Sequence, residues 1–166
     1  MGKHRAGASV ILISPSRTKL RYAARLGFSA ESAKCSNNIA EYEAVLLGLQ
    51  KLRALGVRNC ILNTDCKIVA SQIEKECIAR DPTLERYLDQ VRRMETFFKG
   101  FTVEFIERSK NSKADELAKA AAKNTCIPPD VFFQIMKDPS IKTIDQEPKM
   151  IHPIESLDWR SVIAGN

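Results

Sequence analysis

Apolar and polar residues alternate along this chain in two rhythms, which predict strands and helices in a definite order. The apolar run over residues 8–13 predicts a buried strand. Strict alternation over Lys19–Leu26 predicts a half-exposed strand that pairs with it as an antiparallel hairpin. Apolar residues at helical spacing predict a helix over residues 38–55, and a third strand is expected over residues 57–63.

The middle of the chain continues this pattern. A short helix is expected over residues 68–77, and Asp81-Pro82 then supplies an N-cap and a first-turn proline for a helix that Gly100 ends. Residues 101–106 alternate as a fourth strand. A polar, basic loop over residues 108–112 leads into a last helix over residues 113–123. Strands interleaved with helices in this order predict an α/β fold, with a mixed sheet and helices packed on it.

The sequence changes character after Cys126. Five of the seven prolines lie beyond it, and the helical and strand periodicities fade. We therefore divide the chain into a folded domain over residues 1–125 and a proline-rich tail over residues 126–166. Within that tail, residues 131–136 are expected to form at most one short docked helix, and residues 137–166 are interpreted as a linker.

Composition and charge narrow the functional classes. The 166 residues carry a net charge of +6, and the first thirty contain six Lys or Arg and no acid, which favours a nucleic-acid partner. An apolar run as short as residues 10–13 predicts neither a signal peptide nor a membrane span. The five cysteines form no CxxC pair, so we expect reduced thiols and an intracellular, cytoplasmic or nuclear protein.

Three acids occupy positions that suggest chemistry. Glu41 lies in the first predicted helix, Asp65 directly follows the third strand, and Asp115 opens the last helix. Each has an ordinary structural explanation: Glu41 can complete a capping box with Asn38, Asp65 can cap the next helix, and Asp115 can complement a helix dipole. Together they predict a carboxylate cluster that binds a hard divalent cation, Mg²⁺ or Mn²⁺.

Three stretches in chain order resemble the motifs of type 1 ribonuclease H, in the form found in gypsy-type LTR retrotransposon polyproteins of plants. They are Ser-Asn-Asn-Ile-Ala-Glu-Tyr-Glu-Ala (36–44), Asn-Thr-Asp-Cys (63–66) and Asn-Ser-Lys-Ala-Asp-Glu-Leu-Ala (111–118). The tail around residues 154–160 is similar to the connector of those polyproteins. The resemblance implies a ribonuclease H-like mixed sheet of five strands and two-metal hydrolysis of RNA in RNA–DNA hybrids.

The resemblance also implies roles for particular residues. Glu41, Asp65 and Asp115 match the second, third and fourth of the family's four metal-binding acids, and are the expected catalytic and metal residues. Asn37 and Asn38 match a pair that contacts the hybrid backbone, and the expected nucleic-acid-binding surface also includes the basic residues Arg108, Lys110 and Lys113. The expected partner is an RNA–DNA hybrid, with no membrane and with the chain as a monomer.

The sequence departs from the family pattern in two ways. The family's first strand, with the first acid, has no counterpart ahead of residues 8–13, and the loop at residues 108–112 lacks the histidine of cellular members. The missing strand would lie mid-sheet, between residues 8–13 and 57–63, and would leave a gap of about 10 Å. We therefore expect a truncated product with weak or no nuclease activity. The alternatives are a non-catalytic nucleic-acid binder and a decayed element product.

Overall fold

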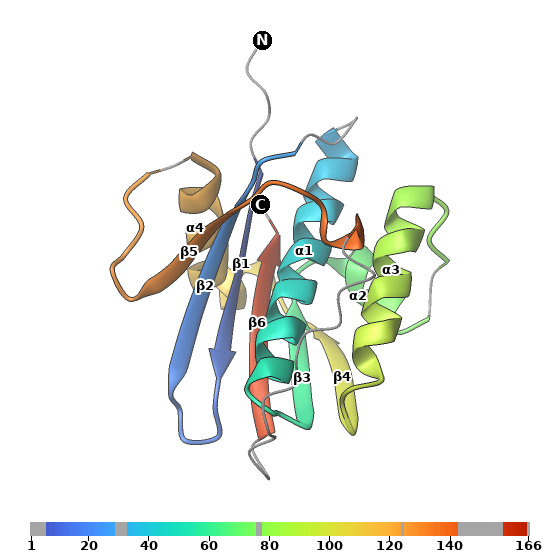
Figure 1. Cartoon of the computed structure of the whole chain (residues 1–166), viewed down its shortest axis with the longest axis horizontal. Coiled ribbons are helices and arrows are strands. Elements are labelled where there is room, and N and C mark those ends of the chain that lie inside the picture. The colour runs from blue at the N-terminus through green and yellow to red at the C-terminus, as the bar shows by residue number, and fades with distance from the viewer. Residues whose placement is uncertain (1–5, 29–32, 76–77, 124, 143–157, 166) are drawn as a thin grey trace.

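The computed structural model describes residues 6–28, 33–75, 78–123, 125–142 and 158–165. They form one mixed sheet with helices on both faces (Figure 1). The strands are β1 (Ala6–Ile13), β2 (Lys19–Leu26), β3 (Asn59–Thr64), β4 (Gly100–Phe105), β5 (Val131–Met136) and β6 (Asp158–Gly165). The helices are α1 (Ala33–Ala54), α2 (Lys67–Ile73), α3 (Pro82–Glu95) and α4 (Ser112–Lys123), with 3-10 turns η1 (Arg108–Asn111) and η2 (Ser140–Lys142).

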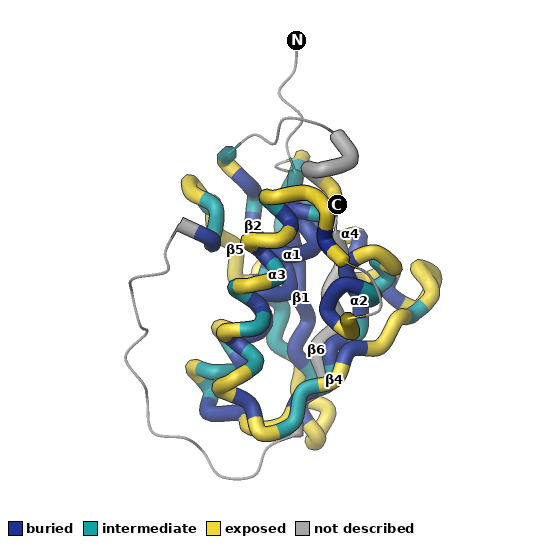
Figure 2. The backbone as a smooth tube through the Cα atoms, turned by 90° about the vertical axis from the view of Figure 1, so that its right-hand side faces the viewer, coloured by how far each residue is buried: buried dark blue, intermediate teal, exposed yellow. Residues whose placement is uncertain are grey.

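The sheet order is β4-β3-β6-β1-β2-β5. β1 and β2 form the predicted antiparallel hairpin, and the turn between them contains Arg17, whose φ is 70° and whose N–H donates to the Ser14 carbonyl. β1 is buried along nearly its whole length, because helices cover both of its faces (Figure 2). In the described part of the chain, no helix combines the length and the apolar character needed to cross a bilayer.

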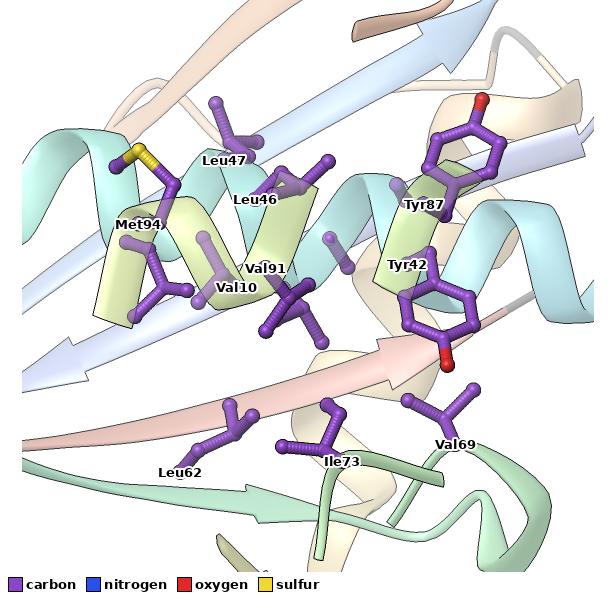
Figure 3. Packing of buried hydrophobic residues seen from close by; sticks show 14 of the residues in the cluster. Val10, Tyr42, Leu46, Leu47, Leu62, Val69, Ile73, Tyr87, Val91 and Met94 are labelled. Carbon is purple, nitrogen blue, oxygen red and sulfur yellow. The ribbon is translucent and has the colours of Figure 1, made fainter. Parts of the chain in front are cut away.

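Helix α1 is the centre of the larger core. It packs on β1 and β6 on one side and on α3 on the other, so apolar side chains are buried around most of its circumference. Tyr42 of α1 and Tyr87 of α3 stack with ring centroids 5.8 Å apart, and their hydroxyls point in opposite directions (Figure 3). The expectation that Asn38 and Glu41 form a capping box was wrong, because α1 begins at Ala33 and both residues lie inside it.

Helix α4 covers the opposite face of the sheet. It lies so close to β1 that a Cβ on Gly7 would be 2.0 Å from the Ala118 carbonyl oxygen, so only glycine fits there. Two residues further along β1, the Ser9 hydroxyl donates to the Ala114 carbonyl oxygen. These two close approaches fix the start of α4, and with it Asp115, against the centre of the sheet.

Two expectations for the tail were wrong. Residues 131–136 form strand β5, which pairs in parallel with β2, where a short helix was expected. Residues 137–166 were interpreted as a linker, but β6 lies within them and fills the place between β1 and β3 where a gap was expected. A short apolar run has no periodicity that separates a strand from a helix, and a vacant strand position offers backbone partners that local sequence does not reveal. The domain boundary at residue 125 stays a prediction, although the sheet takes strands from both sides of it.

The tail is anchored where it crosses the helical face. Ile141 of η2 is buried in the larger core. The Ser140 N–H donates to Glu43 Oε1 at 2.9 Å, and the Ser140 hydroxyl donates to Glu43 Oε2. The Tyr87 hydroxyl also donates to Glu43 Oε1, at 2.6 Å. Glu43 therefore joins α1, α3 and the tail through a buried carboxylate whose pKa is raised by burial.

Candidate functional site

The site forms where β3 ends and the chain turns into α2. The Thr64 hydroxyl, in the last residue of β3, donates to Glu41 Oε1 of α1 at 2.5 Å. The Cys66 N–H, at the start of α2, donates to the same Thr64 oxygen at 3.1 Å. Thr64 thus holds the strand end against the helix, and Asp65 lies between these two anchored residues. The sequence predicted Asp65 at this strand end but did not predict the part that Thr64 plays.

Asp65 is a buried carboxylate with an unsatisfied oxygen. Its side chain is 3% exposed, and Oδ2 has no hydrogen-bond donor among the described residues. The Nε of Arg108, on η1, lies 3.8 Å from Oδ2, which is too long for a hydrogen bond but close enough for electrostatic attraction. A buried charged oxygen without a donor is costly in a folded protein, and a bound cation would relieve that cost.

Glu41 is 1% exposed, and burial raises its pKa to about 8. The hydrogen bond from Thr64 and the positive charge of Arg108 oppose this rise in pKa, whereas the charges of Asp65 and Asp115 add to it. The three predicted acids therefore share one electrostatic environment, as the sequence led us to expect. At neutral pH, Glu41 holds its proton unless a cation enters the site.

Asp115 lies in the first turn of α4 and is buried. Its Oδ2 is 2.8 Å from Lys119 Nζ, one helical turn further on. This ion pair occupies an oxygen that the cluster hypothesis assigns to a cation. The (i, i+4) spacing of the pair could have been read from the sequence, but the sequence analysis missed it.

The predicted nucleic-acid-binding residues surround the acids unevenly. Arg108 is exposed and reaches toward Asp65, and Lys110 and Lys113 are exposed on the following turn. Asn37 is exposed on α1, but the Oδ1 of Asn38 accepts a long hydrogen bond, 3.6 Å, from the Cys66 thiol. Arg108, Lys110 and Lys113 thus provide an exposed positive border beside the buried acids.

The donor set fits a hard divalent cation in its chemistry, because three carboxylates converge and one of their oxygens is buried without a partner. It is not a closed cage: among the described residues, no three Asp, Glu, His or Cys side chains gather tightly enough to enclose an ion. Two cationic side chains, Arg108 and Lys119, stand beside the acids.

Strand β6 reaches the same edge of the sheet without bringing an acid to it. Ile163 pairs with Thr64, so the residue that follows in β6, Ala164, is next in register to Asp65. The acid of this strand, Asp158, pairs with Asn59 at the opposite end. β6 therefore replaces the expected missing strand in position but does not supply a fourth carboxylate at the site.

The raised pKa of Glu41 predicts a pH-dependent stability. The folded chain keeps a proton that the unfolded chain releases above about pH 4.5, so the free energy of unfolding should fall as pH rises toward 8, by up to about 1.4 kcal/mol per pH unit. Glu41→Gln keeps an acceptor for Thr64 and should remove most of this slope. Urea unfolding at pH 5.5, 6.5 and 7.5 measures it.

Glu43 is expected to leave a residual slope of the same sign in the Glu41→Gln variant, because its pKa is also raised. Identical slopes for the parent and the variant would contradict the assignment of a buried, protonated Glu41.

Solved structures with the same architecture define the class of this fold. The crystal structure of RNase H1 from Halobacterium salinarum superposes with a TM-score of 0.65 at 23% identity, covering 75% of this chain and 92% of that one. An RNase H1 isolated from compost, in complex with an RNA/DNA hybrid, gives a TM-score of 0.63 at 22% identity, covering 72% and 87%. The chain therefore has a ribonuclease H-like α/β fold.

The family follows from the sequence profile. The profile described as reverse transcriptase-like matches residues 2–121, so the chain belongs to that family. Ribonuclease HI of H. salinarum is 30% identical over 88 residues, which is 53% of this chain and 44% of that protein. A bifunctional protein of Mycobacterium tuberculosis is 28% identical over 88 residues, 53% of this chain and 24% of that protein. The matched part thus spans between a quarter and a half of the length of these relatives.

Proposed function

We propose that this chain binds RNA–DNA hybrids across the edge formed by Glu41, Asp65 and Asp115, and that it hydrolyses the RNA strand there with the help of a divalent metal. The observation that carries the proposal is the buried Asp65 Oδ2 without a donor, beside two further carboxylates from separate elements. The similarity to ribonuclease HI and to an RNase H1 bound to a hybrid supports it.

Asp65, Glu41 and Asp115 would hold Mg²⁺ or Mn²⁺, which when bound supplies the charge that stabilises negative charge developing on the phosphate. The chain itself has to prepare the acids. Glu41 must lose the proton that burial favours, and Asp115 must release Lys119, which can then turn toward the incoming phosphate. Because β6 brings no carboxylate next to Asp65, we expect slow turnover.

The exposed residues Arg108, Lys110 and Lys113 are proposed to contact the phosphate backbone of the hybrid. Replacing all three with alanine should weaken hybrid binding and reduce the slope of log K against log salt by about 1 for each phosphate that is no longer neutralised. Binding is measured in EDTA at several salt concentrations, so that cleavage does not interfere.

A matched control removes the same charge elsewhere. Arg86, Arg93 and Lys99 are exposed on or just after α3, and their alanine variant should keep the parent slope. Equal losses of affinity in the two triple variants would mean that the chain binds through its overall charge, and would contradict a defined interface.

A second function, a hybrid binder without catalysis, is favoured by one observation. Lys119 and Arg108 already provide positive charge beside Asp115 and Asp65, and Glu41 holds a proton at neutral pH. The two functions separate in one assay: labelled hybrid that is bound in EDTA and stays intact after Mg²⁺ or Mn²⁺ is added supports the binder. Hybrid that is cut under those conditions supports the nuclease.

We further propose that the domain derives from a retrotransposon polyprotein. Support comes from the motifs over residues 36–44, 63–66 and 111–118 and from the tail sequence around residues 154–160, of which residues 154–157 lie outside the described part of the chain. Reading the genomic sequence on both sides for reverse transcriptase and integrase reading frames tests this origin.

A further inference from the structure

Strand β6 is separated in sequence from the sheet that it completes. Its neighbours β1 and β3 lie in the first 64 residues, whereas β6 begins at Asp158. It pairs with β1 over residues 160–165 and with β3 over residues 158–163. Helix α1 contacts one face of β6 and helix α4 the other. The place of β6 is therefore a slot with two strand edges as its sides and a helix on each face (Figure 1).

Backbone hydrogen bonds along both edges are the main determinant of what this slot accepts. They require an extended segment that runs parallel to β3 and antiparallel to β1, whatever molecule that segment belongs to. A second copy of this chain carries a segment with the right sequence and length.

The connection to β6 allows either source. The tail is fixed at η2 by Glu43 and Ile141, and 15 residues separate Lys142 from Asp158. A tether of this length gives the chain's own β6 an effective concentration in the millimolar range, so its own strand wins in dilute solution. A strand from a second copy competes when protein is concentrated or when the tether cannot close.

We propose that the slot between β1 and β3 is a strand-acceptor site for the β6 of a second copy, so that two copies associate by exchanging this strand. Each sheet is then complete, and each copy supplies the central strand of the other. The association does not depend on a metal or on a nucleic acid, so it stands or falls separately from the proposed function.

Cutting the tether in the folded full chain tests the slot directly. A protease site replaces residues 146–152, the folded protein is cut, and a labelled peptide of residues 154–166 is added. The peptide is expected to displace the cut strand and to bind at least ten times more tightly to the cut protein than to the uncut chain. The same peptide with Val162→Pro loses an N–H of the mid-sheet ladder and should bind at least ten times more weakly. Failure of the cut protein to take up the peptide, or equal uptake of both peptides, would overturn the proposal.

Shortening the tether tests exchange between copies. Deleting residues 145–157 leaves three Cα steps between Lys142 and Asp158, about 11 Å at full extension. The path is longer, because Glu43 lies near the Thr64 end of β3 while Asp158 pairs with Asn59, about 17 Å away along the strand. We expect a dimer by light scattering, and a monomer in dilute solution when the 13 residues are replaced by a Gly/Ser linker of equal length. A folded monomer of the shortened chain, or a chain that no longer folds, would count against the acceptor site.

Discussion

Deletion of residues 143–166 is expected to abolish cooperative folding of this chain. The deletion removes β6 and leaves the edges of β1 and β3 without partners, in a slot with a helix on each face. Each buried backbone group left unpaired costs about 1–3 kcal/mol, so a few such groups exceed the 5–15 kcal/mol that holds a typical domain together. Thermal unfolding followed by circular dichroism should show no sharp transition.

A rearranged chain provides the control for this deletion. Gly165 pairs with Ala8, so the end of β6 adjoins the start of β1. Moving residues 158–166 to a position ahead of Met1 should therefore restore the sheet, with the moved strand now entering as the first arm of a hairpin. We expect its transition to lie within a few degrees of the parent's. A deletion variant that unfolds at the parent temperature would show that β6 adds nothing to stability.

The sequence predicted the elements whose pattern is set locally. The hairpin of β1 and β2 was predicted nearly residue by residue, because alternation over Lys19–Leu26 continues without a break. α3 was predicted from its Asp81 cap, whose carboxylate accepts from Thr83 and Leu84. Local rules also placed Asp65 at a strand end and Asp115 in a first helical turn.

The sequence did not predict β5 and β6, because their formation depends on vacant edges far away in the chain. β6 finds its partners about a hundred residues back, and nothing local distinguishes it from a linker. The same reason limits the site. The raised pKa of Glu41 comes from α1 being packed on both sides, and the hydrogen bond from Thr64 needs α1 and β3 in contact. Neither can be read from residue spacing.

Replacing Asp65 with asparagine is expected to remove metal-dependent hybrid cleavage. The variant neutralises the carboxylate whose Oδ2 is buried without a donor, so a hard cation loses its best-placed charged oxygen. A metal contributes several kcal/mol to such a reaction, so we expect at least a hundredfold loss of rate. Cleavage of a labelled RNA–DNA hybrid in Mg²⁺ and in Mn²⁺ measures it.

The same substitution should leave stability unchanged or raise it. An amide in place of the buried carboxylate removes a charge that the fold leaves uncompensated, and its N–H groups face the neighbouring carboxylates of Glu41 and Asp115. Asp89→Asn, on the exposed side of α3, is the matched control and should change neither rate nor stability. An Asp65→Asn variant that loses activity only because it unfolds would contradict the assignment.

A readout independent of turnover decides the role of Asp65 even where cleavage is slow. A cation that binds only the folded chain adds RT ln(1 + [L]/Kd) to the free energy of unfolding and so raises the unfolding temperature. Mn²⁺ should stabilise the parent chain, more at pH 8 than at pH 6 because Glu41 must release its proton, and should not stabilise Asp65→Asn. Equal shifts in the parent and the variant would place the cation elsewhere and leave these three acids as buried structural groups.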